Sequence, residues 1–216
     1  MMDLSQVQLA EEFFSSEEKE RIREAVVRAE KGSSGEIATM VVWASDRYRE
    51  AEALGALLLA ALVAVVVAVA FRHVTIWSYI PLVCLLFYPV LLLLRRFPRL
   101  KLSFAGANRV AEAVRERALV AFYQQGLYRT KEETGILVFI SLLERKVWIL
   151  GDRGINRKIP PGQWQSLVDE LTRGLREGTA ADSLCRVISR CGDELARHFP
   201  RQSDDLNELP DEIIVS

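Results

Sequence analysis

The chain has 216 residues, of which half are hydrophobic and 26% are charged, and its formal net charge is −1. A face that binds nucleic acid needs an excess of Lys and Arg to neutralise phosphates, so this balance argues against nucleic acid as a partner. Once two central apolar runs are set aside, the remainder is long enough for one domain with a sizeable core.

The N-terminal part predicts a helix followed by a buried strand. The helix begins after Ser15 or Ser16, where Ser15 and Glu18 have the spacing of a capping box. Its apolar residues recur at helical spacing and are Ile22, Ala25, Val26 and Ala29. After the Gly-Ser-Ser-Gly segment 32–35, the nearly unbroken apolar run Glu36–Ala44 is typical of a strand covered on both faces. We therefore predict a central strand there.

Two apolar runs, Gly55–Phe71 and Val74–Leu94, follow this strand. Each is near the ~20 residues that a helix needs to cross ~30 Å of hydrocarbon, and neither contains Asp, Glu, Lys or Arg. We predict a transmembrane helical hairpin over residues 54–97. The alternative, a hairpin buried in a soluble core, is disfavoured because residues 57–67 have no polar stripe. The span limits are Leu54, Phe71, Val74 and Leu94.

Basic residues close to the runs predict their orientation. Arg47 and Arg49 precede the first run, whereas the turn between the runs has Arg72 and His73. The residues that follow the second run are Arg95, Arg96, Arg99 and Lys101, which are also placed to meet anionic lipid headgroups. The positive-inside rule then predicts a multi-pass protein of the inner (cytoplasmic) membrane with its domain and both termini in the cytoplasm. Residues 1–12 lack the features of a secretory signal, which agrees with this prediction.

The sequence after the hairpin predicts a helix, two strands and two more helices. Apolar residues at three- and four-residue steps from Val110 to Phe122 predict a helix that Gly126 ends. Gly135–Ser141 and Lys146–Leu150 are expected to be strands joined by a tight turn. The first two strands of the chain should be parallel, and the third antiparallel to the second.

The order of elements predicts an α/β fold, a three-layer α/β/α sandwich with a small mixed sheet and an inserted transmembrane helical hairpin. Residues 1–53 and 98–200 supply the two parts of the domain, and residues 201–216 form an acidic tail. Its final apolar residues, 213–215, could dock on the domain or contact a partner. In the first span, small residues recur every four positions at Ala56, Ala60, Ala64 and Ala68. They permit either a homo-oligomer or, as we prefer, packing against the second span.

This topology gathers acidic residues at one end of the sheet. Glu36, Glu132, Glu133 and the loop Gly151–Asn156 are expected there, with Ser45 at the opposite, membrane-facing end. Carboxylates, Asn156 and loop carbonyls offer the hard oxygen ligands that suit Ca²⁺ or Mg²⁺. In the alternative interpretation the same carboxylates cap helices or pair with basic residues such as Arg129, Lys131, Arg153 and Arg157. The two histidines lie far apart in the sequence, so neither a His-based zinc site nor a Ser-His-Asp triad is expected.

Several of these segments resemble the TPM domain family, named after thylakoid-lumen, photosystem II repair and receptor-modulating membrane proteins. They are residues 14–19 (Phe-Ser-Ser-Glu-Glu-Lys), 34–37 (Ser-Gly-Glu-Ile), 126–137, 141–156 and 207–213. The resemblance implies an α/β/α sandwich and a divalent-cation site in an acidic cluster, to which Asp152 and Glu36 correspond by position. It also implies an acid-phosphatase activity, which has been proposed for chloroplast members. The chain departs from the family in having its hairpin inserted within the first crossover, and few carboxylates beyond Asp152 in the loop.

Two functions follow as expectations. The one we favour is a membrane-anchored, divalent-cation-binding interaction or assembly module whose partner is a membrane protein. Its metal ligands would be Asp152, Glu36, Glu133 and Asn156, with Ca²⁺ or Mg²⁺ as the ion. The alternative is a metal-dependent phosphatase in which Arg153 or Arg129 holds the phosphate and an ion-bound water attacks.

Overall fold

The computed structural model describes residues 4–72, 75–130, 133–201 and 211–215. The chain forms two compact units. One consists of Met1–Ser45 and Ala113–Ser216, and the other of Asp46–Glu112.

The first unit is built on a four-stranded mixed sheet with the order β3-β2-β1-β4. Its strands are β1 (Glu36–Val42), β2 (Gly135–Ser141), β3 (Lys146–Gly151) and β4 (Ile214–Val215). β1 is parallel to both β2 and β4, whereas β3 is antiparallel to β2. The predicted directions and the interior position of β1 are confirmed. β1 ends at Val42, two residues before the predicted Ala44.

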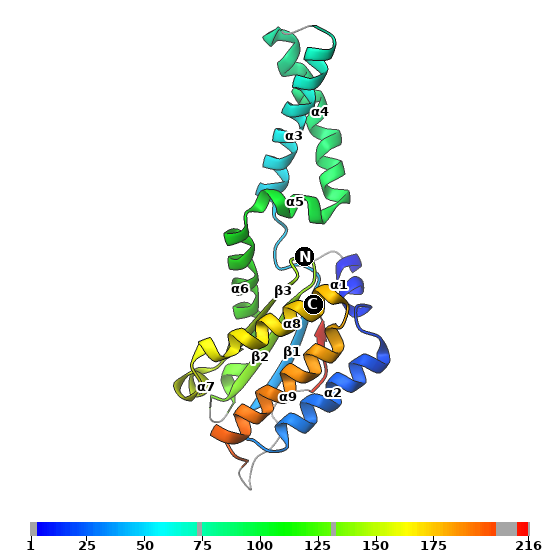
Figure 1. The fold of residues 1–216 in the computed structure, drawn as a ribbon. Coiled ribbons are helices and arrows are strands. Elements are labelled where there is room, and N and C mark those ends of the chain that lie inside the picture. Colours follow the sequence, from blue (N-terminus) through cyan, green and yellow to red (C-terminus); the bar gives the residue numbers. More distant parts are fainter. Residues whose placement is uncertain (1–3, 73–74, 131–132, 202–210, 216) are drawn as a thin grey trace. The chain divides into compact units, whose positions relative to one another are not determined.

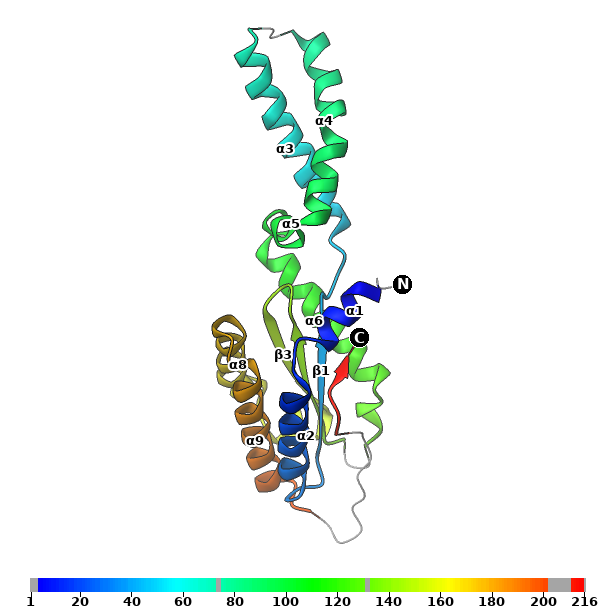
Figure 2. The ribbon, with the colours of Figure 1, turned by 90° about the vertical axis from the view of Figure 1, so that its right-hand side faces the viewer.

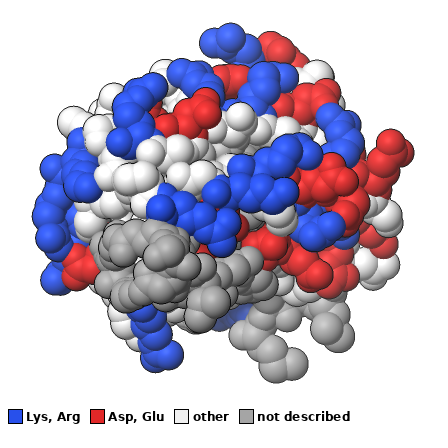
Figure 3. All heavy atoms as spheres, turned by 90° about the horizontal axis from the view of Figure 1, so that it is seen from below, with Lys and Arg blue, Asp and Glu red and all other residues white. Residues whose placement is uncertain are grey.

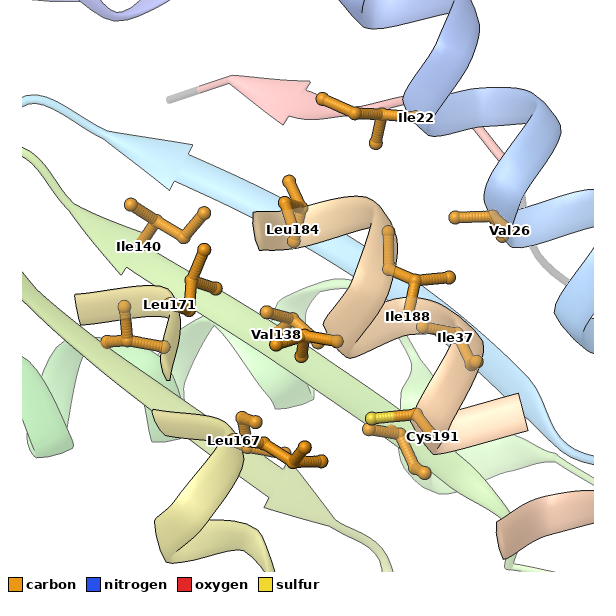
Figure 4. Close-up of a cluster of buried hydrophobic side chains, with 14 of the residues drawn as sticks. Ile22, Val26, Ile37, Val138, Ile140, Leu167, Leu171, Leu184, Ile188 and Cys191 are labelled. Atoms are coloured by element: carbon orange, nitrogen blue, oxygen red, sulfur yellow. The ribbon is translucent and has the colours of Figure 1, made fainter. Parts of the chain in front are cut away.

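Helices cover both faces of this sheet (Figures 1 and 2). On one face lie α2 (Ser16–Glu30), α8 (Gln165–Glu177) and α9 (Ala180–His198). They enclose the larger core, which Figure 4 shows with side chains of α2, α8 and α9 directed at those of β1 and β2. The labelled members include Ile22, Val26, Ile37, Val138, Leu171, Leu184 and Ile188.

The other face of the sheet is covered by α6 (Ala107–Gln124), which begins in the second unit and continues into the first. Val114, Ala118 and Phe122 of this helix pack against Met40 and Phe139 of the strands. Successive residues of β1 thus enter different cores, as the alternation of side chains along a strand requires. The three-layer α/β/α architecture is confirmed.

Two strong local signals of the sequence are confirmed in the structure. The capping box of α2 is present: the Ser15 hydroxyl accepts the Glu18 N–H at 3.2 Å, and the Glu18 carboxylate accepts the Ser15 N–H at 2.8 Å. Gly126, with φ of 73°, follows α6 in the left-handed region where glycine is favoured. The C-terminal residues dock on the domain as β4, where Met40 pairs with Ile214.

Several short elements were not predicted. They are α1 (Leu4–Glu11), α5 (Pro98–Ala105), α7 (Arg153–Lys158) and the 3-10 turns η1 (Leu127–Arg129) and η2 (Pro161–Trp164), besides β4. One or two helical turns carry too little periodicity to be recognised in sequence. In a folded chain they are stabilised by what they contact.

The second unit contains two long apolar helices, α3 (Arg49–Ala70) and α4 (Ile76–Arg96), which pack against each other. By length and composition both could cross a membrane. The small residues of α3 are buried, with Ala56, Ala60 and Ala64 fully inaccessible, and the Tyr79 hydroxyl of α4 donates to the Ala61 carbonyl at 3.2 Å. The predicted span limit Val74 lies outside the described residues.

Candidate functional site

The predicted site lies where β1 and β2 begin and β3 ends. The Asp152 N–H donates to the Gly135 carbonyl at 2.9 Å, and the Gly154 N–H donates to the Glu133 carbonyl at 3.0 Å. Because Glu36 pairs with Gly135 in the sheet register, these bonds bring Glu36, Glu133 and the loop after β3 to one end. The predicted gathering is confirmed for these residues, while Glu132 and Lys131 lie outside the described residues.

Ser45 lies at the opposite end of the sheet, as predicted. Its hydroxyl is 2.9 Å from the Ser141 hydroxyl, and its N–H donates to the Glu144 carboxylate at 2.9 Å. Ser141 is the last residue of β2, whereas the acidic residues lie beside its first residue. The two ends of the sheet therefore differ in chemistry.

Asp152 is the N-cap of α7, and its side chain accepts the Arg153 N–H at 2.7 Å. Its second carboxylate oxygen, Oδ2, is buried and accepts no hydrogen bond from the part of the chain that the structure describes. Gly151 permits this tight loop, since a Cβ there would lie 2.6 Å from Ile155. A buried oxygen without a partner is destabilising and marks a position where a bound group could satisfy it.

The other predicted ligands have protein partners. Glu133, at a left-handed φ of 55°, forms an ion pair with the exposed Arg157. The Asn156 amide nitrogen donates to the Gly151 carbonyl at 2.6 Å. Arg129 donates from Nε to the Tyr128 hydroxyl at 2.9 Å, and Arg153 is exposed. The structure therefore gives Glu133 and Arg157 the ion-pairing role that was the alternative interpretation.

Glu36 belongs to a second acidic group that the sequence did not reveal. It is buried at the start of β1, close to Glu30 at the end of α2, whose carboxylate accepts the Ile37 N–H at 2.7 Å. Asp211, just before β4, hydrogen-bonds the Glu30 carboxyl. Burial raises the pKa of Glu30 to about 8; the Ile37 N–H lowers this pKa, and Glu36 and Asp211 raise it further. Glu30 is therefore predominantly protonated at neutral pH.

In sequence, Glu30 resembles any acidic residue in the last turn of a helix. The one available signal was its position two residues before the Gly-Ser-Ser-Gly segment that leads into β1. Asp211 lies far from it in the chain and reaches it only because β4 pairs with β1. No sequence spacing predicts that Glu30 and Asp211 lie close together.

The surface at this end carries charge of both signs. Viewed from below, Figure 3 shows Lys and Arg side chains beside Asp and Glu side chains. Within residues 4–72, 75–130, 133–201 and 211–215, no three His, Cys, Asp or Glu side chains come together as a group that could hold a metal ion. The cation site predicted from Asp152, Glu36, Glu133 and Asn156 therefore stays a prediction.

Comparisons with known proteins agree with the fold. The model of the TPM domain matches residues 103–194, a range that contains Glu133, Asp152 and Asn156 but not Glu36. Among solved structures, the NMR structure of the BA42 protein from the psychrophilic bacterium Bizionia argentinensis is similar, with a TM-score of 0.59 and 22% identity. The similarity covers 94% of this chain and 96% of that chain, and at this identity it concerns the fold alone. No curated protein matches this chain in a sequence comparison.

Proposed function

We propose that this chain, of which residues 103–194 match the TPM domain, is anchored in a membrane by the α3–α4 hairpin and acts as an interaction or assembly module. In this proposal the sheet end formed by Glu36 and Asp152 binds a divalent cation, Ca²⁺ or Mg²⁺. The partner would be another membrane protein, because the anchor confines the domain to the membrane surface.

The surface of the hairpin carries the proposal. Large apolar side chains of both helices are exposed, among them Leu58 (52%), Leu62 (60%), Val66 (61%), Ile80 (55%) and Leu85 (73%). A soluble protein rarely exposes a contiguous apolar surface of this kind, whereas lipid chains would cover it. The charges of the hairpin lie near its ends: Glu52 in the first turn of α3 pairs with Arg95 in the last turn of α4 at 2.5 Å.

The proposed orientation follows from the residues at the two ends of the hairpin. Arg47 and Arg49 precede α3 or begin it, and Arg95, Arg96 and Arg99 end α4 or follow it. By the positive-inside rule this end faces the cytoplasm, so the domain would lie on the cytoplasmic side of the inner membrane. A fluorescent protein fused to the C-terminus should then fold and fluoresce, and a fusion that is correctly made but dark would refute this orientation.

Extraction of membranes with alkaline carbonate tests the anchor. The full chain is expected to remain in the membrane pellet, because carbonate releases peripheral proteins and leaves spanning helices in place. The matched control replaces Leu54–Leu100 by a short polar linker and should appear in the soluble fraction. Release of the full chain into the supernatant would contradict the anchor.

The cation proposal is supported by the buried Oδ2 of Asp152. A divalent ion would satisfy this oxygen, and Glu36 and Asn156 lie at the same end of the sheet. Glu133 would join only by leaving Arg157, with which it forms an ion pair. Asp152→Asn removes the charge and keeps the shape of the cap, so it is the variant that separates cation binding from a purely structural role.

A metal-dependent phosphatase is the second candidate, since the exposed Arg153 adjoins Asp152 in the loop and could hold a phosphate beside the ion. Arg129 could also hold it if it left the Tyr128 hydroxyl. The test is hydrolysis of p-nitrophenyl phosphate with Mg²⁺, Ca²⁺ or EDTA. Turnover that needs a metal and is lost in Asp152→Asn would establish the enzyme, and its absence would leave the interaction module.

A further inference from the structure

Positive charge is concentrated at the base of the hairpin, in residues 46–54 and 94–112 of the second unit. These segments contain seven Lys and Arg against four Asp and Glu, a net charge of +3, although the whole chain has −1. The basic residues are Arg47, Arg49, Arg95, Arg96, Arg99, Lys101 and Arg109. The base of the hairpin is therefore locally cationic in a chain that is otherwise slightly acidic.

Part of this charge is not neutralised within the protein. Arg95 pairs with Glu52, and Arg109 pairs with Asp46, each at 2.5 Å. Three other arginines, Arg49, Arg96 and Arg99, are exposed and form no ion pair or hydrogen bond with the described residues. They are available to an anion from outside the chain.

α5 is fixed against the start of α3. The Lys101 ammonium donates to the Arg47 carbonyl at 2.8 Å, and the Phe104 ring packs so closely on Gly55 that a Cβ there would lie 2.7 Å from it. Next to the free arginines, Phe97 (54%) and Leu100 (41%) expose apolar rings and chains. Exposed apolar and basic residues side by side are typical of a segment that lies in the interface of a membrane.

A pocket of about 530 Å³ lies at the base of the hairpin. Its lining contains three arginines, two carboxylates and apolar side chains: Arg47, Arg49, Arg109, Asp46, Glu50, Leu54 and Phe104. The first turn of α3 borders it, and the side chain of the N-cap residue Tyr48 forms no cap hydrogen bond with the described residues. A helix N-terminus favours negative charge, which Glu50 and Glu52 of the first turn already supply in part, so the exposed arginines are the main attraction for an anion.

We propose that this pocket and α5 bind the headgroup of an anionic phospholipid. Arg49 would contact the phosphate, and Arg109 would join it only by leaving Asp46. Arg99 would add charge at the surface, and Leu54 and Phe104 would contact the start of the acyl chains. A zwitterionic lipid is a weaker ligand because its headgroup cation is repelled by the surplus of arginines. This inference rests on the proposed membrane anchor, and the base of the hairpin would select anionic over zwitterionic phospholipids.

The experiment is a calorimetric titration of the full chain in non-ionic detergent micelles with dihexanoyl phosphatidylglycerol and, separately, dihexanoyl phosphatidylcholine. We expect the anionic lipid to bind at least about tenfold more tightly, a ratio that one charged hydrogen bond can supply. Arg49→Gln/Arg99→Gln should remove most of this preference. The charge-matched control, Arg173→Gln/Arg176→Gln on the exposed side of α8, should retain it.

Equal affinity for the two lipids, or equal weakening by the control variant, would overturn the proposal. Binding of glycerol phosphate as tightly as of the lipid would also overturn it, because the ligand would then be a soluble phosphate. If the double variant does not fold, the titration is repeated with the unmodified chain at increasing salt. At about 1 M salt the Debye length is about 3 Å, so a preference for the anionic lipid that persists there contradicts an electrostatic headgroup site. Carbonate extraction does not depend on lipid class, so failure of the anchor is recognised separately.

Discussion

The partly buried carboxyl of Glu30 gives the clearest stability prediction. Its pKa of about 8 in the folded domain compares with 4.5 for an ordinary glutamate. Between these pH values the folded state holds a proton that the unfolded state has released, so the free energy of unfolding should fall as pH rises and level off above pH 8. At about 1.4 kcal/mol for each unit of pKa, the loss is on the order of 3–5 kcal/mol.

Glu30→Gln should remove this loss. Glutamine keeps an oxygen for the Ile37 N–H but cannot ionise beside Glu36 and Asp211. The variant should therefore gain stability over the unmodified chain as pH rises, from near zero at about pH 5 to several kcal/mol at about pH 9. The matched control is Glu24→Gln, since Glu24 is exposed on the same helix and its pair with Arg28 is a surface pair.

The assay is urea unfolding of the full chain in micelles at a series of pH values, with EDTA present and tryptophan fluorescence as the signal. The difference in unfolding free energy between Glu30→Gln and the unmodified chain is the quantity of interest. A difference that stays constant from about pH 5 to about pH 9 would refute the reasoning, because a group with a raised pKa must make it vary. Equal behaviour of Glu24→Gln would attribute the effect to general surface charge.

Three further predictions concern the domain. Ser15→Ala should lower the unfolding free energy by about 1 kcal/mol through loss of the capping box, as urea unfolding would measure; no change would mean that the cap is dispensable. Gly192→Ala should cost about 1–3 kcal/mol because its Cβ would lie 2.6 Å from that of Ala29, whereas Gly162→Ala, in open space, should change little. Cys191, whose pKa burial raises to about 12, should react with a maleimide only after unfolding, and labelling of the native protein at the rate of a free thiol would contradict this.

The main elements of the fold could be predicted from sequence because their signals are local. The signals are the apolar run of β1, the tight turn between β2 and β3, and the helical periodicity of α2, α6, α8 and α9. Each of them lies within one segment of the sequence. The handedness and spacing of the connections then set the strand directions. Short elements such as α5, α7 and β4 were missed because tertiary contacts stabilise them, with β4 held by pairing with Met40 and Val41.

The candidate site was predicted only in part. The shared end of the sheet followed from strand direction, which placed Glu36 and Asp152 together. Two features could not be predicted because they depend on side-chain geometry between segments that are distant in sequence. They are the ion pair of Glu133 with Arg157 and the approach of Asp211 to Glu30. The sequence therefore predicts where the site lies, whereas the hydrogen bonds and ion pairs of each carboxylate are known only from the structure.

The central claim is that the sheet end binds a divalent cation, and calorimetric titration of the full chain in micelles with Ca²⁺ and Mg²⁺ tests it most directly. We predict saturable binding of one of these ions that Asp152→Asn abolishes. Asp169→Asn, on the exposed side of α8, is the control and should leave the binding intact. Heat of dilution alone with the folded, unmodified chain, or binding that Asp152→Asn leaves unchanged, would contradict the claim.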